Sequence, residues 1–232
     1  MLLNKGADLT GGLLWHMRAL VARQGRWSPF RAQLEEWLAG WAPPNRTLLL
    51  VGPSAGWCLP DSFLTRFDHL HAMDIDPVAE LFFRRLHGGA LRRAGASLSW
   101  SRTDFFADPS VVLAAHPEAA LIFCNVAGQR CVQVSDPAAV EAEMSALQVL
   151  LQGRNWASFH DLLSATTNVV LPVRSLSRRM NPHELISSYG LGGEWFDHMT
   201  GGLLPLHAAR LILPWRFKHD RLHLIEAGWV AE

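Results

Sequence analysis

The stretch TLLLVGPSAGWCLP, residues 47–60, decides the fold. Its first five residues, Thr47–Val51, are apolar without a polar face, which is typical of a strand covered on both sides. The segment GPSAG, residues 52–56, then forms a turn of small residues. Such a turn either presents a nucleophile, because the letters fit G-x-S-x-G, or lets a nucleotide-type ligand approach the backbone.

Strands and helices alternate after this first strand, which predicts right-handed βαβ units and a parallel sheet. The expected strands are Thr47–Val51, His69–Asp74, Ser97–Thr103, Ala119–Asn125 and Trp156–His160. The expected helices are Asp61–Phe67, Pro77–His87 (stopped by Gly88-Gly89), Pro109–His116 and one that begins at Asp136-Pro137 and ends at Gly153.

Both ends of the chain depart from this alternation. Residues 1–45 predict a helical extension of two helices, and residues 46–232 a second domain with an insertion at about 164–205 that holds a short helix near Pro182–Tyr189. The chain is expected to end in an antiparallel hairpin that turns at Lys218–Arg221. The apolar faces expected for the two N-terminal helices are Leu13, Leu14, Met17, Leu20 and Val21, then Phe30, Leu34, Trp37, Leu38 and Trp41.

Composition narrows the class of protein. The formal net charge of the 232 residues is zero, so no global charge favours a nucleic acid or a membrane surface. Three cysteines are too few for a disulfide framework, the histidines follow no HExxH pattern, and no metal site is expected. The N-terminus lacks the order of a signal peptide, and no apolar run is long enough to span a membrane. We therefore expect a cytoplasmic protein acting on a small molecule, with a homodimer left open.

Acidic and amide side chains follow the second, third and fourth predicted strands. They are Asp74 in HAMDIDP, Asp104 in SRTDFF and Asn125 in FCNVAGQ. Open α/β sheets bind ligands at the carboxyl ends of their parallel strands, where these residues would meet. Asp74 is placed to accept hydrogen bonds from ribose hydroxyl groups, and Asp104 to accept one from an adenine amino group.

This succession resembles the class I S-adenosylmethionine (SAM)-dependent methyltransferases over about residues 47–230. The resemblance implies a Rossmann-like, mostly parallel seven-stranded sheet with helices on both faces, a C-terminal antiparallel hairpin and an N-terminal helical extension. In LLLVGPSAG, the outer glycines of the family motif align with Gly52 and Gly56, and its middle glycine with Ser54. The cofactor-binding residues implied for SAM are Gly52, Pro53, Ser54, Ala55, Gly56, Asp74, Ile75, Asp104, Phe105 and Asn125.

The sequence also departs from the family. The acidic residue of its first strand falls at Leu50, so the contact with the cofactor's amino end must come from elsewhere or be missing. The fourth strand ends in NVAG, residues 125–128, and not in the (D/N)PP(Y/F) pattern of nucleobase amino-group methyltransferases. A dinucleotide enzyme is disfavoured, because GPSAGW lacks two glycines of GxGxxG.

The polar residues after the fifth strand and in the insertion are candidates for the methyl-acceptor side. They are His160, Asp161, Asp197 and His198. A histidine there can act as a general base, because it titrates near neutral pH. Transfer itself would be an in-line displacement at the sulfonium methyl group, which needs mainly positioning and exclusion of water.

Two alternative functions are also compatible with the sequence. A non-catalytic binding or assembly protein with the same fold agrees with Leu50 and with the unmatched fourth-strand motif. A serine hydrolase would use Ser54 as its nucleophile. Against the hydrolase, the turn follows the first strand, no HGGG-like loop precedes it, and Pro53 removes a backbone donor.

Overall fold

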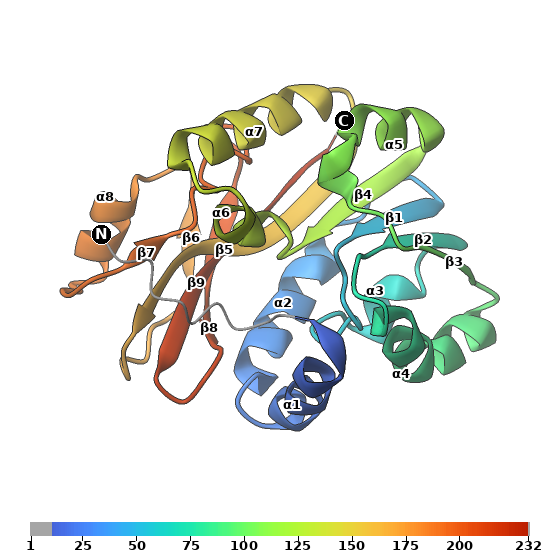
Figure 1. Ribbon diagram of the computed structural model, residues 1–232, viewed down its shortest axis with the longest axis horizontal. Helices are drawn as coiled ribbons and strands as arrows, with labels where there is room; N and C mark the ends of the chain where they lie inside the picture. Colours follow the sequence, from blue (N-terminus) through green and yellow to red (C-terminus); the bar gives the residue numbers. More distant parts are fainter. Residues whose placement is uncertain (1–10, 232) are drawn as a thin grey trace.

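The computed structural model describes residues 11–231 and contains one sheet of nine strands. The strand order is β3-β2-β1-β4-β5-β9-β8-β6, with β7 paired to β5 (Figure 1). The strands are β1 Thr47–Val51, β2 His69–Met73, β3 Ser97–Ser101, β4 Ala119–Cys124, β5 Trp156–Thr166, β6 Arg174–Leu176, β7 Phe196–Asp197, β8 Arg210–Arg216 and β9 Arg221–Val230.

The first five strands are parallel and have the order 3-2-1-4-5. The chain therefore reverses its winding between β1 and β4, and such a switch point opens a crevice at the carboxyl ends of the strands. The terminal hairpin of β8 and β9 adds antiparallel to β5. This is the arrangement expected from the resemblance to class I methyltransferases, so the predicted fold class is confirmed. The sheet has nine strands because the insertion contributes β6 and β7, which the sequence did not predict.

Helices cover both faces of the sheet, and β1 shows why. Leu48 and Leu50 belong to the core cluster beneath α1, α2, α3 and α4, whereas Leu49 and Val51 belong to the cluster beneath α5 and α7. All four side chains are buried, as the apolar run predicted. The helices are α1 Gly12–Gln24, α2 Ser28–Gly40, α3 Asp61–Leu64, α4 Ala79–Ala94, α5 Pro109–Ala115, α6 Arg130–Gln133, α7 Pro137–Leu150 and α8 Pro182–Ser188.

Helix α4 does not stop at Gly88-Gly89, so that predicted boundary is wrong. The helix continues to Ala94 and ends at Gly95, whose φ of +74° gives the left-handed cap that glycine favours. Gly88 is buried within the helix.

The predicted apolar face of α1 is also wrong. Leu13, Leu14, Met17, Leu20 and Val21 are exposed, and the side that faces the protein is built from His16 and Ala19. The helix is held by the packing of Trp15 on Trp27 and Phe217 and by hydrogen bonds of Gly12 and His16 to Asp76, near the carboxyl ends of the strands. The predicted face of α2 is correct, since its five large apolar side chains are buried.

Tryptophan side chains join α2 and its preceding turn to the terminal hairpin. The Trp215 ring of β8 lies 4.9 Å from Phe30 and 5.1 Å from Trp27, measured between ring centroids. Trp37 of α2 lies 5.5 Å from Trp229 of β9. Aromatic pairs at this spacing stabilise packing beyond the area that they bury, so the N-terminal helices lie firmly on the sheet.

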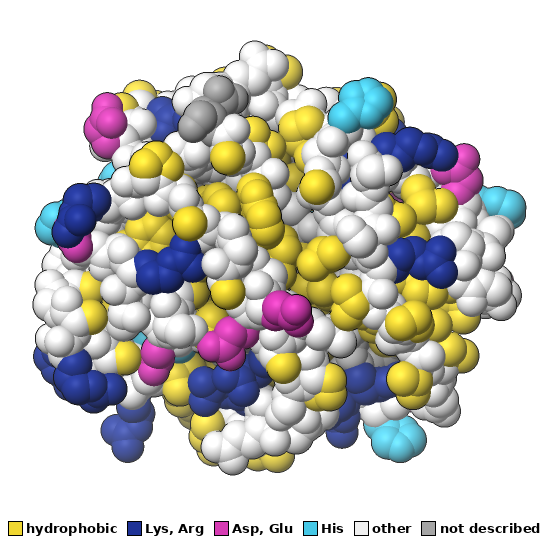
Figure 2. Space-filling view, turned by 180° about the vertical axis from the view of Figure 1, so that it is seen from behind, with side chains coloured by type: hydrophobic (Ala, Val, Ile, Leu, Met, Phe, Trp, Pro, Cys, Tyr) yellow, Lys and Arg dark blue, Asp and Glu magenta, His cyan; other side chains and the backbone are white. Residues whose placement is uncertain are grey.

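The molecular surface carries charges of both signs. On the face seen in Figure 2, the Lys and Arg side chains stand apart from one another, with apolar side chains between them. Over residues 11–231, no helix combines the length and apolar character that crossing a bilayer requires.

A buried ionic cluster ties the fifth strand to the hairpin. Glu226 of β9 accepts a hydrogen bond from Arg210 Nη1 at 2.9 Å, and its second oxygen lies 3.3 Å from His160 Nε2 of β5. Burial alone would raise the pKa of Glu226, but the contacts with His160 and Arg210 lower it below its ordinary value of 4.5. An ionised carboxylate is therefore part of the folded core.

Removing this carboxylate should destabilise the fold in a pH-dependent way. We expect Glu226→Gln to lower the free energy of unfolding at pH 7 by about 3 kcal/mol, because Arg210 is left as an unpaired buried charge. The folded pKa lies below the unfolded one, so the stabilisation is complete above the unfolded pKa and is lost as the pH falls through the folded pKa. Urea unfolding of both proteins between pH 3 and pH 7 measures the difference, with the exposed Glu118→Gln as the control. A difference that stays constant down to pH 3 would contradict this assignment.

Candidate functional site

A cleft of about 400 Å³ opens at the carboxyl ends of β1, β2 and β3, beside the turn that follows β4. Asp74 and Asp104, which the sequence placed at the ends of different strands, share it. Of the residues predicted to bind a cofactor, Gly52, Ser54, Asp74, Ile75, Asp104 and Phe105 line it. The cleft thus occupies the switch point of the sheet, where a ligand site is expected.

The turn after β1 is held by Asp74. The backbone N–H of Ser54 donates to Asp74 Oδ2 at 2.6 Å, and that of Asp76 donates to Oδ1 at 2.9 Å. Burial raises the pKa of Asp74, whereas these two backbone bonds oppose the shift. Each oxygen retains a lone pair, so the carboxylate can still accept from a ligand in the cleft.

Asp104 offers a freer carboxylate. Its Oδ1 accepts from the backbone N–H of Phe106 at 2.9 Å, whereas Oδ2 has no hydrogen-bond partner among the described residues. Ile75, on the same cleft, is 60% exposed. An exposed aliphatic side chain beside a free acceptor is suited to a flat, apolar group that carries a hydrogen-bond donor.

Four predicted cofactor residues do not line the cleft. Pro53 and Ala55 are buried behind the turn, and Gly56 packs on α4, where an added Cβ would lie 2.6 Å from His87 Nε2. Asn125 turns away from the cleft toward Asp161. The turn therefore presents the two positions Gly52 and Ser54 to the cleft and buries the others.

Gly52 is required by packing within the protein. Its φ is +63°, and an added Cβ would lie 2.5 Å from the Cβ of Val126, which follows β4. The turn after β1 thus touches the turn after β4 across the switch point. The sequence predicts that this glycine lets a ligand approach the backbone, and the contact with Val126 is a second reason for a glycine at this position.

The start of α1 forms a wall of the cleft that the sequence did not reveal. Gly11 and Gly12 line it, and the backbone N–H of Gly12 donates to Asp76 Oδ2 at 2.8 Å. His16 Nε2 lies 3.1 Å from the same oxygen, and its Nδ1 accepts from Trp57 Nε1 at 3.0 Å. Since a donor faces Nδ1, the proton lies on Nε2 and points to Asp76. This chain of bonds fixes the helix over the site.

Ser54 lacks the partners of a hydrolytic nucleophile. Its φ of +51° is strained, as in a nucleophile elbow, but its Oγ is buried without a hydrogen-bond partner. No histidine of the described chain lies within hydrogen-bond distance of it. The geometry therefore provides no general base for a serine hydrolase.

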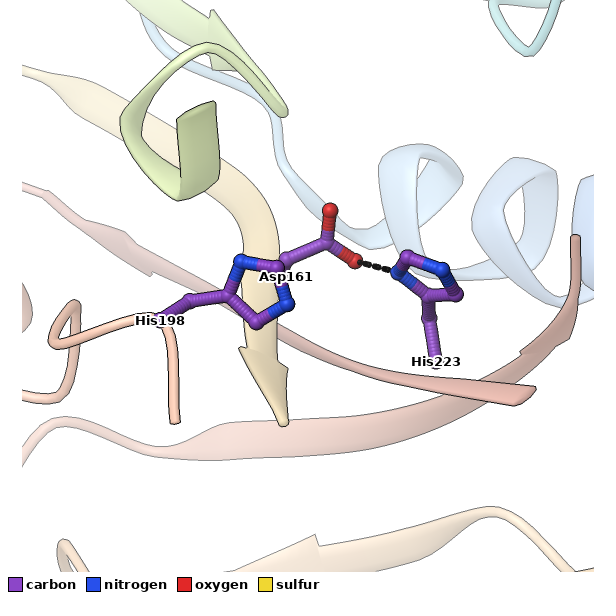
Figure 3. A group of neighbouring side chains, drawn as sticks. All are labelled: Asp161, His198 and His223. Carbon is purple, nitrogen blue, oxygen red and sulfur yellow. Dashed lines mark hydrogen bonds and ion pairs between the residues drawn. The ribbon is translucent and has the colours of Figure 1, made fainter. Parts of the chain in front are cut away.

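A second polar group lies behind the turn after β4. Asp161 of β5 accepts from Asn125 Nδ2 at 3.0 Å, and its backbone N–H donates to Asn125 Oδ1 at 2.6 Å. Its other carboxylate oxygen lies 2.5 Å from Nδ1 of His223 on β9. Figure 3 shows Asp161 between His198 and His223. His223 was missed by the sequence analysis, because it lies inside an alternating strand that reads as structural.

The other predicted acceptor-side residues have separate roles. His198 donates from Nδ1 to the carbonyl of Gly128 at 2.9 Å, and its Nε2 lies 3.1 Å from Ser164 Oγ. Asp197 accepts from the backbone N–H of Met199. His160 does not join Asp161, because adjacent strand residues point to opposite faces, and its side chain belongs to the ionic cluster with Glu226.

The ionisation of this group follows from its contacts. Burial alone would raise the pKa of Asp161, but the two histidines and the bonds from His223 and Asn125 hold it well below the usual range. Burial lowers the pKa of His198, which keeps that imidazole neutral near pH 7. Asp161 is thus a buried anion stabilised by its neighbours.

Asp161, His198 and His223 also offer metal-ligand atoms within 4.8 Å of one another. The hydrogen bonds account for this proximity, because both nitrogens of His198 have partners and Nδ1 of His223 is bonded to Asp161. A metal ion would have to break the bonds to Ser164 and between Asp161 and His223. The donor set therefore fits a hydrogen-bonded network better than a metal centre.

No protein-family model matches the chain, and no curated protein sequence does. Solved structures that resemble it include the N-methyltransferase NodS from Bradyrhizobium japonicum WM9, at 12% identity and a TM-score of 0.45, over 88% of this chain and 98% of NodS.

Two further structures resemble the chain. The magnesium protoporphyrin IX methyltransferase ChlM from Synechocystis PCC 6803, with bound SAM, has 11% identity and a TM-score of 0.47, over 94% of this chain and 85% of its own. The amino pentose methyltransferase CalS10 from Micromonospora echinaspora has 15% identity and a TM-score of 0.37, over 92% and 80%. At these identities function has to be argued from the residues of the site.

The contact between the two turns predicts the effect of a methyl group at Gly52. We expect Gly52→Ala to lower the free energy of unfolding by about 2 to 4 kcal/mol, because it adds overpacking against Val126 to the cost of the positive φ. Gly190→Ala is the matched control, since its φ is +67° and nothing lies within 4 Å of the added Cβ.

The double variant Gly52→Ala/Val126→Ala separates the two causes. It should recover part of the loss, giving a coupling energy of about 1 kcal/mol in urea unfolding. Equal losses for Gly52→Ala and Gly190→Ala, with no recovery in the double variant, would show that the turns are not in contact.

Proposed function

We propose that the protein binds SAM in the cleft at the switch point and transfers its methyl group to a small-molecule acceptor. The observation that carries the proposal is the pair of carboxylates, Asp74 and Asp104, on one cleft at the ends of neighbouring parallel strands. Adenosine carries donors at both ends, in its ribose hydroxyls and its adenine amino group. The two carboxylates supply acceptors for both ends.

Each residue on the cleft has a role in this proposal. Asp74 accepts from the ribose hydroxyls, and the free Oδ2 of Asp104 accepts from the adenine amino group. Ile75 and Phe105 pack on the purine, which is apolar on its faces. When bound, SAM supplies an electrophilic methyl group on its sulfonium. The protein's own contribution is then to fix that methyl group in line with the acceptor and to exclude water.

The part of the cleft that would bind the amino-acid end of the cofactor lacks the family's acidic residue. Leu50, at the position of the family's acid, is fully buried in β1 and provides no charge. The turn and helix after β4 instead contribute Gln129, Arg130 and Gln133 to the cleft. Arg130 is held by both carboxylate oxygens of Glu143 at 2.8 Å, so its charge is already compensated. We therefore place the methionine moiety beside neutral amide groups.

A non-catalytic member of this fold is the second candidate, and Leu50 is the specific observation in its favour. It would keep the cleft but not the transfer. A serine hydrolase is disfavoured, because Ser54 Oγ has no base within reach.

Calorimetry tests the proposal directly. We expect SAM and its demethylated product, S-adenosylhomocysteine, to bind with a stoichiometry of one at micromolar affinity. Binding of both without turnover over any acceptor panel would favour the non-catalytic protein. If neither ligand binds at millimolar concentration, the SAM site is refuted.

Asp104→Asn is the sharpest variant, because asparagine can still accept from the backbone N–H of Phe106 and so preserves the local fold. Its amide nitrogen replaces the free acceptor, and we expect SAM affinity to fall by about 1.5 to 3 kcal/mol, roughly ten- to a hundred-fold. Asp220→Asn, on the exposed hairpin turn, serves as the control. Thermal unfolding should not distinguish the two variants, and an unchanged affinity for SAM would remove Asp104 from the adenine site.

A further inference from the structure

The turn after β4 has two sides, and they face two different polar groups. Val126, Gln129 and Arg130 line the SAM cleft, whereas Asn125 and Gly128 contact Asp161 and His198. Gly128 is in close contact, since an added Cβ would lie 2.6 Å from Asp161 Cβ. The turn after β4 therefore separates the pair of Asp161 and His223 from the cofactor cleft.

His223 differs from the other buried histidines of the described chain in its free nitrogen. The remaining four, His16, His87, His160 and His198, have contacts at both ring nitrogens. His223 uses Nδ1 toward Asp161, whereas no described residue forms a hydrogen bond with its Nε2, and the side chain remains 11% exposed. A buried carboxylate thus orients an imidazole whose other nitrogen is available.

This arrangement has the geometry of a general base. Asp161 accepts from Nδ1–H, which fixes the tautomer that places the lone pair on Nε2. Asn125 holds Asp161 in turn, through its side-chain oxygen and nitrogen. The three side chains come from the end of β4, the middle of β5 and β9, so the base is oriented by rigid parts of the sheet.

A bulge in β5 aims Asp161 toward this base. The register between β5 and β9 shifts between Asp161 and Leu163, so one residue of β5 is left unpaired. Bulges beside active sites commonly redirect a side chain. Here the bulge follows directly after the aspartate that meets His223.

We propose that His223, oriented by Asp161, is the general base of the methyl transfer and that the acceptor is a hydroxyl group. This rests on the proposed function. The hydroxyl oxygen forms a bond to the methyl carbon while the bond from that carbon to sulfur breaks, and its electron pair remains on sulfur. The hydroxyl proton passes to His223 Nε2. The products are a methyl ether, S-adenosylhomocysteine and an imidazolium ion beside the Asp161 carboxylate.

The charged surroundings suit such a proton transfer. Asp161 faces His223 from β5, the neutral His198 lies 6.0 Å away between ring centroids, and Arg221 contacts Ser164 behind His198. The ionised Asp161 compensates the charge that develops on His223, as the carboxylate does in a Ser-His-Asp triad. An acceptor that attacks without losing a proton would have no use for this pair.

Site-resolved modification with diethyl pyrocarbonate tests the proposal without a known acceptor. The reagent acylates neutral imidazole nitrogens that are free, and peptide mass spectrometry measures the rate at each histidine. At pH 8 we expect His223 to react at least tenfold faster than His160 and His198. Comparable rates at the three positions would contradict a free Nε2. Asp161→Asn should slow His223 by at least threefold, because an asparagine can also donate to Nδ1 and no longer fixes the tautomer that leaves the Nε2 lone pair free, whereas Asp220→Asn should leave the rate unchanged.

Protection by sinefungin, the SAM analogue with an amine-bearing carbon in place of the sulfonium, tests proximity to the methyl group. We expect saturating sinefungin to slow His223 at least fivefold without protecting the exposed His183. Sinefungin that binds by calorimetry but gives no protection would overturn this proposal alone, and failure to bind would overturn the SAM site as well. Protection by micromolar Zn²⁺ in the absence of sinefungin would replace the base with a metal centre.

Discussion

The site depends on one close contact across the switch point of the sheet. At β1 and β4 the chain leaves the sheet toward opposite faces, and the two turns would separate if nothing joined them. Gly52 and Val126 meet there at a distance that excludes even a methyl group. This contact fixes the floor of the cleft, and it lets one turn present Ser54 to the cleft while the other presents Asn125 to Asp161. The cofactor side and the acceptor side of the proposed site are thus positioned by the same pair of residues.

The parallel sheet could be predicted from sequence because each strand is recognised from its own residues. In β1 the run of Leu and Val predicts burial on both faces, and Leu48 and Leu49 do enter opposite cores. Asp74 and Asp104 could be placed together because parallel strands bring their carboxyl ends to one edge. The position of the cleft was therefore anticipated from the ends of three strands, without any knowledge of side-chain contacts.

Features that depend on tertiary contacts were not predictable. The apolar stripe of α1 faces solvent, because His16 and Asp76, distant in sequence, fix the other side of the helix. Gly88-Gly89 reads as a helix stop, but α4 runs through both residues and ends at Gly95, because glycine propensity is a weak signal beside the contacts of the whole helix. His223 gives no local signal, since a histidine within an alternating strand most often reads as a structural residue. Each of these misses concerns a partner more than 25 positions away or a packing contact that one segment cannot reveal.

The adjacent residues His160 and Asp161 of β5 point to opposite faces of the sheet and make different kinds of contact. His160 points to the face where Glu226 and Arg210 form a buried ionic cluster. Asp161 points to the other face, where Nε2 of its partner His223 has no hydrogen bond from the part of the chain that the structure describes. Because the cluster around Glu226 is fully buried, it stabilises a junction of strands and lies out of reach of a substrate. The side chain of His223 keeps some exposure to solvent, so our proposal gives the proton transfer to Asp161 and His223 and a structural role to His160.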